Sequence, residues 1–378
     1  MIKIIKSFVF FFIFIAIFGC SLDKKTGIWN SEEKIKKTAA KALEESKKVK
    51  IKIFSKVNNF NKEIAATTKV HLTKPKKNLS WLTPELNNQN FLGNIYFSGL
   101  NDRFLKKKVG RNKFSTTSTS KHVSPPLVYE NSIIIANDSG YIYSVNTNGK
   151  INWKTFIYKK KFKKVYKSLS FVIYKKKIYV SDNIGFIYCV NFENGEVIWQ
   201  KNFGIPFKSN IKIYNDKIFV INQDDKVYCI DLTGSKIWDM QSVTSFIKSQ
   251  KKLKLGFSKD GFLFFINSSG DLSKVDANQG RMFWSISTLD PLLSDGADFF
   301  KSSNIVVDDS DIIFSNIHST YSIDLNSGYV NWKVDIQSNN TPIIDGDNVF
   351  LISDNGYFIN LERKSGKVIW STNVLKAL

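Results

Sequence analysis

One arrangement of alternating apolar and polar residues recurs along the chain. Between Asp182 and Trp199 the sequence has a turn, an alternating strand from Gly185 to Asn191, a second turn at Asn194-Gly195 and a short strand that ends at tryptophan. The other five copies run from Gly140 to Trp153, Asp225 to Trp238, Gly270 to Trp284, His318 to Trp332 and Gly356 to Trp370. An internal repeat of this kind decides the fold class before any single motif does.

Each copy belongs to a larger unit of four short strands. The clearest unit has strands at Ser170 to Tyr174, Lys177 to Asp182, Gly185 to Asn191 and Val197 to Phe203. Successive tryptophans are 38 to 48 residues apart, which is the period of the four-stranded blades of β-propellers. We therefore predict an all-β fold, a β-propeller of four-stranded repeats.

The recurring tryptophan and glycine have structural roles in this prediction. A single four-stranded sheet is apolar on both faces, and stacking against neighbouring sheets buries both. The glycine supplies the positive φ of a tight turn, and the tryptophan offers a large apolar surface between blades. The predicted inter-blade residues are Trp153, Trp199, Trp238, Trp284, Trp332 and Trp370.

The N-terminus has the features of an export signal. Lys3 and Lys6 precede an uncharged apolar run from Phe8 to Phe18, which is short for a membrane span. We predict a signal peptide at residues 1–19. Its end, before Cys20, resembles a bacterial lipobox, so Cys20 is the predicted lipidation site. A cleaved signal with an incidental cysteine is the alternative.

The rest of the chain divides into a tether and one domain. Residues 20–50 are rich in Lys, Glu and Ala and are expected to tether the lipidated cysteine to the folded body, with a short helix as the alternative. Residues 51–378 are expected to form a single propeller domain. Its repeats are degenerate over 51–125 and clear over 126–378. Arg103 to Val109 is a candidate last strand of a blade that has lost its tryptophan.

The chain is strongly basic and contains few cysteines. Its formal net charge is +22, which favours an anionic partner such as a lipid headgroup or an acidic protein face; nucleic acid is not expected for an exported protein. Most lysines are scattered singly, which also fits a solvated outer face. Cys189 and Cys229 occupy the same slot in consecutive repeats, a slot held elsewhere by Ser144 and Ser322. We predict two unpaired, buried thiols there.

Two short motifs place the repeat in a known class. Cys229-Ile230-Asp231 with Gly234 and Trp238, and Val275-Asp276 with Gly280 and Trp284, resemble PQQ-type propeller repeats. Together with the lipobox, they make the chain similar to the BamB family of outer-membrane assembly lipoproteins.

This resemblance implies eight blades, with seven as the alternative. It also implies a scaffold anchored by its lipid to the periplasmic face of the outer membrane. Such a scaffold docks on a BamA-like barrel assembly protein and assists unfolded outer-membrane proteins.

The resemblance also suggests a docking site. The contact in this family lies on loops between blades, and the matching segment here is Gly204 to Asn210, after Trp199. Phe207 and Lys208 are the predicted partner-binding residues, as an aromatic and a cation in a short exposed turn. In the alternative interpretation, Phe207 only caps its blade.

Enzymatic chemistry is the competing hypothesis, because PQQ-type repeats also build quinoprotein oxidoreductases. The sequence has no vicinal cysteines and no Cys-x-x-Cys-His motif, and His71, His122 and His318 are widely separated. Acidic clusters at Asp224-Asp225 and Asp308 to Asp311 lack the ligand spacing of an EF-hand and are expected to form turns. We therefore expect no catalytic, cofactor or metal site. An adhesion or peptide-binding propeller is a third hypothesis.

Overall fold

The structure is a computed structural model, and the part of the chain it describes consists of two units, Met1–Lys56 and Val57–Leu378. The described residues are 20–22, 29–31, 60–67, 69–99, 105–110, 113, 124–243, 248–249, 251–289 and 300–377. In the first unit, β1 (Cys20–Leu22) pairs with β2 (Trp29–Ser31) in an antiparallel hairpin. The predicted signal peptide and the helix considered for the tether lie outside the described residues.

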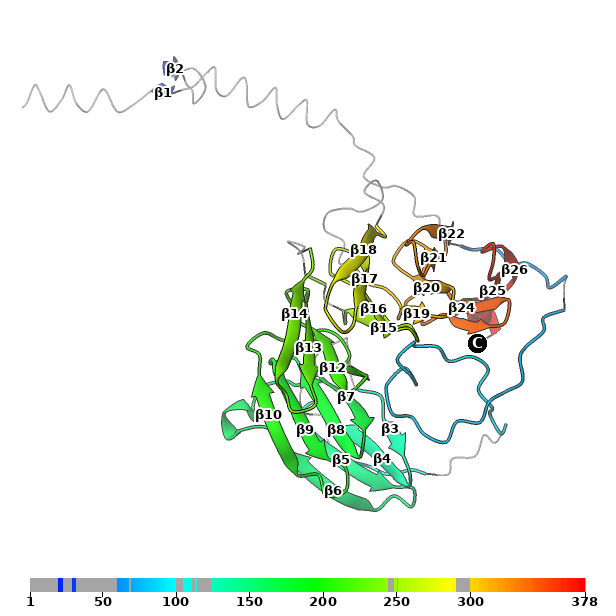
Figure 1. The fold of residues 1–378 in the computed structure, drawn as a ribbon. Helices are drawn as coiled ribbons and strands as arrows, with labels where there is room; N and C mark the ends of the chain where they lie inside the picture. Colours follow the sequence, from blue (N-terminus) through cyan, green and yellow to red (C-terminus); the bar gives the residue numbers. More distant parts are fainter. Residues whose placement is uncertain are drawn as a thin grey trace, which may run out of the picture. The chain divides into compact units, whose positions relative to one another are not determined.

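Six four-stranded antiparallel sheets follow one another along the described part of the second unit (Figure 1). The first sheet is β3 (Leu127–Tyr129), β4 (Ser132–Ala136), β5 (Tyr141–Asn146) and β6 (Ile151–Phe156). The second is β7 (Leu169–Tyr174), β8 (Lys177–Asp182), β9 (Phe186–Asn191) and β10 (Val197–Asn202). The third is β11 (Lys212–Tyr214), β12 (Lys217–Ile221), β13 (Lys226–Asp231) and β14 (Lys236–Gln241).

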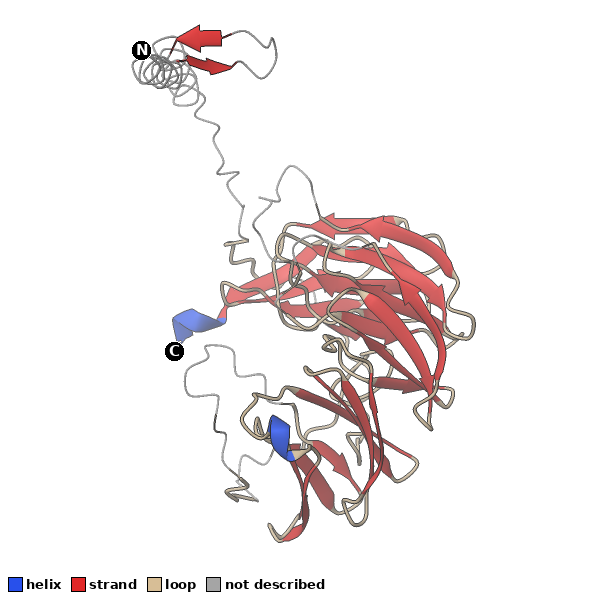
Figure 2. Ribbon diagram, turned by 90° about the vertical axis from the view of Figure 1, so that its left-hand side faces the viewer, coloured by secondary structure: helices blue, strands red, loops and turns tan. Residues whose placement is uncertain are grey.

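The other three sheets repeat this up-and-down order. The fourth is β15 (Lys254–Phe257), β16 (Phe262–Ile266), β17 (Asp271–Asp276) and β18 (Met282–Ser287). The fifth is β19 (Val306–Val307), β20 (Asp311–Ser315), β21 (Thr320–Asp324) and β22 (Val330–Val334). The sixth is β23 (Ile343–Asp345), β24 (Asn348–Ile352), β25 (Tyr357–Glu362) and β26 (Val368–Asn373). The short 3-10 helices η1 (Lys160–Phe162) and η2 (Val374–Ala377) complete the picture of an almost purely β protein (Figure 2).

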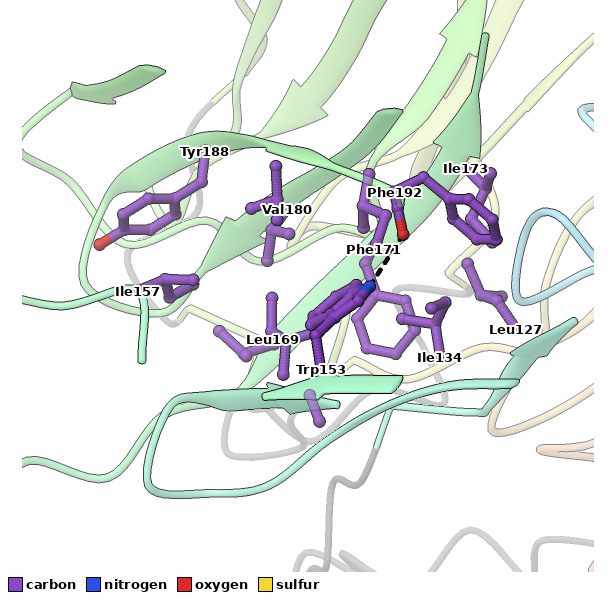
Figure 3. Packing of buried hydrophobic residues seen from close by; sticks show 14 of the residues in the cluster. Leu127, Ile134, Trp153, Ile157, Leu169, Phe171, Ile173, Val180, Tyr188 and Phe192 are labelled. Atoms are coloured by element: carbon purple, nitrogen blue, oxygen red, sulfur yellow. Dashed lines mark hydrogen bonds between the residues drawn. The ribbon is translucent and has the colours of Figure 1, made fainter. Parts of the chain in front are cut away.

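Neighbouring sheets pack face to face through shared apolar clusters. Between the first two sheets, Ile134 and Trp153 from one side meet Phe171 and Val180 from the other (Figure 3). Four further clusters of the same kind join the second sheet to the third, the third to the fourth, the fourth to the fifth and the fifth to the sixth. Burial of both faces of each sheet is the expected packing of a propeller, so the predicted fold class is confirmed.

Five tryptophans dock on the following sheet in the same way. In each sheet the pairing of the third and fourth strands shifts register beside the tryptophan, as in a β-bulge. The indole N–H then donates to a backbone carbonyl of the next sheet's last turn, with N···O distances of 2.6–3.3 Å. The pairs are Trp153 with Phe192, Trp199 with Leu232, Trp238 with Ala277, Trp284 with Asn326 and Trp332 with Arg363.

The repeated glycine is required by this docking. At Gly280 the backbone has φ +73°, and a Cβ there would lie 2.8 Å from Cδ2 of Trp238. A side chain would therefore strain the backbone and collide with the indole ring. The turn glycine and the preceding sheet's tryptophan form one contact, which explains why the two residues recur together.

The sixth tryptophan lies in a different setting. Trp370 packs against Phe358 and Phe350 of its own sheet, at ring-centroid distances of 5.1 and 6.4 Å. The neighbour of its strand is Ile64, whose N–H and C=O exchange hydrogen bonds of 3.0 Å with Ser371. On the first sheet, Leu105 lies against Gly149, in the place that a tryptophan takes elsewhere.

Residues before 126 therefore connect the last sheet to the first without forming a full blade in the described residues. Six complete blades are present in the described part of the chain, and the expected count of eight stays a prediction.

The slot opposite the tryptophan holds small residues in the first three sheets and in the fifth, but not in the fourth. Cys189 and Cys229 are buried free thiols, as predicted. In the fourth sheet, however, the partner of Trp284 is Lys274. Its ammonium donates to Leu325 O at 3.1 Å and lies 4.2 Å from the ring centroid of Phe262. A long cation is accommodated here because the next turn supplies an acceptor.

No helix among the described residues has the length and apolar character needed to cross a membrane.

Candidate functional site

The predicted docking segment lies at one end of the second and third sheets. Because successive strands are antiparallel, the connections between sheets share an end with the turns between second and third strands. We call this the connection end of the sheets. Residues 204–210 link β10 to β11 there, beside the turn after β8 and the turn after β12.

Phe207 is buried at this end, contrary to the expectation of an exposed aromatic. Its side chain is 5% exposed and packs edge-on against Phe203 and Tyr228, with centroids 5.7 and 6.1 Å away. Its N–H donates to Asp182 O at 3.0 Å. Phe207 belongs to the apolar cluster shared by the second and third sheets, because the turn folds back over the space between them. A docking role for its side chain has no support in this geometry.

Lys208 is held by its backbone between two sheets. Its N–H donates to Ile221 O at 2.8 Å, and its carbonyl accepts from Leu253 N–H at 2.9 Å. The side chain is half-buried, and burial lowers the pKa of its ammonium. No hydrogen bond or ion pair of this ammonium is found among the described residues. Lys208 thus presents a positive charge from a fixed backbone.

A pocket of about 220 Å³ opens beside Lys208 at the connection end. Lys208, Lys251 and Lys252 line it, together with the hydroxyls of Ser168, Ser170, Ser181 and Ser209. Lys252 donates to Asn210 Oδ1 at 2.7 Å and also lines a second cavity of about 320 Å³. The two cavities therefore adjoin at this side chain.

Asp182 is the carboxylate among the residues that line this pocket, and its oxygens already have partners. Oδ1 accepts the N–H groups of Ile184, Gly185 and Phe186 at 2.8–2.9 Å. Oδ2 accepts the Tyr158 hydroxyl at 2.6 Å. Burial raises the pKa of Asp182. This carboxylate organises the turn after β8, and its single charge balances only part of the charge of the three lysines that line the pocket.

An irregular segment, residues 81–92, runs along the first strands of five sheets; we call it the inner segment. Its Trp81 pairs with Val128 of β3, and its Leu82 carbonyl accepts from Ile173 of β7. Further on, the Asn88 amide donates to Ile213 O of β11 at 2.7 Å. This segment has no periodic pattern of apolar residues, and its several asparagines are the sequence feature that fits side-chain bonds to backbone carbonyls.

Asn90 joins two further sheets to the inner segment. Its amide donates to Leu255 O at 3.0 Å and to Ile305 O at 2.7 Å. The backbone beside it also accepts, since Gln89 O receives the Val307 N–H at 2.9 Å. The inner segment therefore satisfies the free edges of the first strands, which a propeller otherwise leaves unpaired.

Several buried lysines surround one carboxylate of the inner segment. Glu85 Oε2 lies 3.7 Å from the Lys212 ammonium, whose side chain is 1% exposed. Burial lowers the pKa of Lys212 and Lys254, and lowers that of Lys252 to about 8. Lys252 lies deep in the molecule yet keeps part of its surface accessible to the cavities. Three lysines thus share a single glutamate.

The acidic clusters are engaged in ion pairs between sheets. Asp308 and Asp311 both pair with Arg363 of the sixth sheet, the former at 2.7 Å. Asp225 pairs with Lys248 at 3.1 Å and accepts the Ser268 N–H at 2.7 Å. Within the described residues, no group of three or more His, Cys, Asp or Glu side chains is arranged to hold a metal ion.

Fold and site together define a class of protein: a β-propeller of PQQ-type repeats with its variable connections gathered at one end. The family model described as outer membrane protein assembly factor BamB matches residues 93–210 and 167–372. The matches cover most of the chain, and the chain belongs to this family.

Curated relatives carry the same description. The BamB of Shewanella oneidensis is 23% identical over 210 residues, covering 53% of this chain and 52% of that protein. Across three such relatives, the match spans 51–58% of the relative's length. The chain therefore spans about half the length of the curated relatives it matches.

Solved structures share the fold. BamB from Moraxella catarrhalis has a TM-score of 0.51 at 14% identity, with 66% of this chain and 71% of that chain covered. The quinohemoprotein alcohol dehydrogenase from Comamonas testosteroni has the same TM-score at 11% identity, with 66% and 58% covered. At such identities the likeness concerns the fold alone.

Proposed function

We propose that the chain is a non-enzymatic scaffold lipoprotein of the outer-membrane protein assembly machinery. In this proposal a lipid on Cys20 anchors it to the periplasmic face of the outer membrane. The propeller docks on the periplasmic domains of a BamA-like barrel protein and assists the assembly of unfolded outer-membrane proteins. The observation that carries the proposal is the family match over residues 93–372.

The connection end is the proposed docking face. Lys208 is held there by backbone hydrogen bonds to both neighbouring sheets, so its position is fixed before binding, and a preformed contact loses little entropy. The net charge of +22 favours an acidic face on the partner. Phe207 anchors residues 204–210 to the apolar cluster beneath them, and its proposed contribution to docking is to hold Lys208 in position.

The test is a binding measurement with the periplasmic domains of the BamA-like protein from the same organism. Reversing the charge with Lys208→Glu is expected to weaken binding about tenfold, which corresponds to roughly 1.4 kcal/mol. Lys367→Glu is the matched control, because Lys367 is an exposed lysine in the last turn of the sixth sheet, at the opposite end. Equal losses for both variants would show non-specific charge attraction. Unchanged binding of Lys208→Glu would reject the connection end as the docking face.

A further inference from the structure

The pocket beside Lys208 has more positive charge than its own carboxylate balances. Three lysines are among its lining residues, Lys208, Lys251 and Lys252. The opposing carboxylate, Asp182, accepts four hydrogen bonds from its own surroundings. Like charges gathered in a partly buried space repel one another unless an anion joins them.

One buried polar group in this pocket has no partner. Ser181 is 1% exposed and lines the pocket, yet its Oγ makes no hydrogen bond among the described residues. A buried hydroxyl without a partner costs about 1–3 kcal/mol, so proteins normally satisfy it or use it. This hydroxyl and the three lysines of the pocket together supply the hydrogen-bond donors that an oxyanion needs.

We propose that this pocket binds a phosphate group, either as the free ion or as the headgroup of an anionic lipid. Lys208 and Lys252 supply charge from two neighbouring segments, the connections before β11 and before β15, which pair at Ser209 and Leu253. Ser181 donates its hydroxyl from β8. The elements that hold these donors are fixed independently of any ligand, because Leu253 N–H bonds Lys208 O and Phe207 N–H bonds Asp182 O.

The chemistry of the donors favours phosphate over a carboxylate. Ammonium and hydroxyl groups from three separate segments suit a tetrahedral anion, which has acceptor oxygens in several directions. A planar carboxylate is matched best by the flat fork of an arginine, and no arginine lines this pocket among the described residues. The four serines and three lysines among its lining residues also disfavour an uncharged ligand.

Direct binding to the full chain in neutral detergent tests the proposal, with inorganic phosphate as the probe and chloride at equal ionic strength as the reference. Isothermal calorimetry is expected to show one site per chain. Lys252→Met and Ser181→Ala are expected to weaken that site at least tenfold and several-fold, respectively. Lys367→Met, at the opposite end, is the matched control and is expected to leave it unchanged. No partner protein is present, so the outcome is independent of the docking proposed above.

A second arm separates the two sources of phosphate. Vesicles of phosphatidylcholine with and without phosphatidylglycerol are offered to the full chain carrying Cys20→Ser, which removes the proposed lipid. Flotation that needs phosphatidylglycerol and falls with Lys252→Met assigns the headgroup, whereas calorimetric binding without such flotation assigns the free ion. Absence of phosphate binding in calorimetry together with flotation insensitive to Lys252→Met overturns the proposal, as does binding that Lys252→Met and Lys367→Met weaken equally.

Discussion

Lys252 illustrates how much stability a protein loses when a charged side chain is buried at a candidate binding site. Its ammonium has one hydrogen bond within the described part of the chain, to Asn210 Oδ1 at 2.7 Å, and the nearby Glu85 is already the neighbour of Lys212. Burial lowers the pKa of Lys252 from 10.5 to about 8. Below that pH the folded protein holds a poorly compensated charge, which opposes folding.

This cost predicts a pH-dependent gain of stability in Lys252→Met. Below pH 8 both folded and unfolded chains bind the proton, and the folded state bears the full penalty of the buried charge. Between about pH 8 and 10.5 the unfolded chain binds more protons, so the stability of the native protein rises with pH. Lys252→Met is therefore expected to be more stable than the native protein at pH 7, by on the order of 1–2 kcal/mol after solvent screening.

The measurement is urea unfolding of both proteins at pH 7, 8.5 and 10. The advantage of the variant should shrink steadily and vanish near pH 10.5. Lys367→Met, at an exposed position, serves as the control and should show no pH-dependent difference. A constant advantage for Lys252→Met at every pH would mean that the gain comes from packing and that the buried charge has no such cost.

At the scale of elements, the inner segment provides the hydrogen-bond partners that a neighbouring strand provides elsewhere. Residues 81–92 form no strand, yet they supply hydrogen-bond partners to the first strands of five sheets. Asparagine suits this task because its short amide donates to two carbonyls at once. Asn90 also has φ +55°, a conformation that asparagine tolerates better than most residues.

Replacing Asn90 tests this role. Asn90→Ala loses two buried hydrogen bonds, and alanine tolerates a positive φ less well than asparagine does. The expected cost is about 2–4 kcal/mol in the free energy of unfolding. Asn90→Gly loses the same bonds without the backbone strain and should cost about 1 kcal/mol less. Asn148→Ala, in an exposed turn of the first sheet, should stay within about 0.5 kcal/mol of the native protein. A value that small for Asn90→Ala would show that the inner segment does not stabilise the sheets.

The sequence predicted some of these features and not others, for physical reasons. The recurrence of residues such as Gly280 and Trp238 could be predicted, because a single contact requires both residues and so fixes their spacing. The burial of Phe207 could not be predicted, because the direction in which the seven-residue turn 204–210 folds depends on contacts with Tyr228, which lies in the next sheet. The inner segment could not be predicted because the amides of Asn88 and Asn90 reach carbonyls 125 to 215 residues away, and no local period encodes such bonds.

The candidate pocket was only partly predictable. Lys208 was identified from its neighbourhood in the sequence. Ser181 and Lys252 come from two other sheets, and only the packing of consecutive sheets brings them beside Lys208. Lys252 looks like any other lysine of a basic chain, since burial is a property of the fold and not of the residue.

At the scale of the whole described propeller, each sheet shares its apolar faces with its neighbours. Every one of the five clusters contains residues of two consecutive sheets, and the inner segment bonds to five sheets in turn. Unfolding any of the second to fifth sheets would expose the faces of two others. Repeat proteins with such strong interfaces unfold as a unit, whereas weak interfaces let the ends open separately.

A pair of core variants distinguishes these two cases. Leu127→Ala affects the first sheet and Ile359→Ala the sixth, and both side chains are 0% exposed. Each is expected to cost about 2–5 kcal/mol, and each should lower the midpoint of the same single urea transition. Tryptophan fluorescence and far-UV circular dichroism should give coincident curves for both variants, as two-state unfolding requires. Among the described residues the inner segment bonds to the first strands of the first five sheets and has no hydrogen bond to the sixth, so Ile359→Ala is the more demanding test. If that variant unfolded in two steps while Leu127→Ala unfolded in one, the sixth sheet would be an independent unit and the inner segment would define the cooperative part of the propeller.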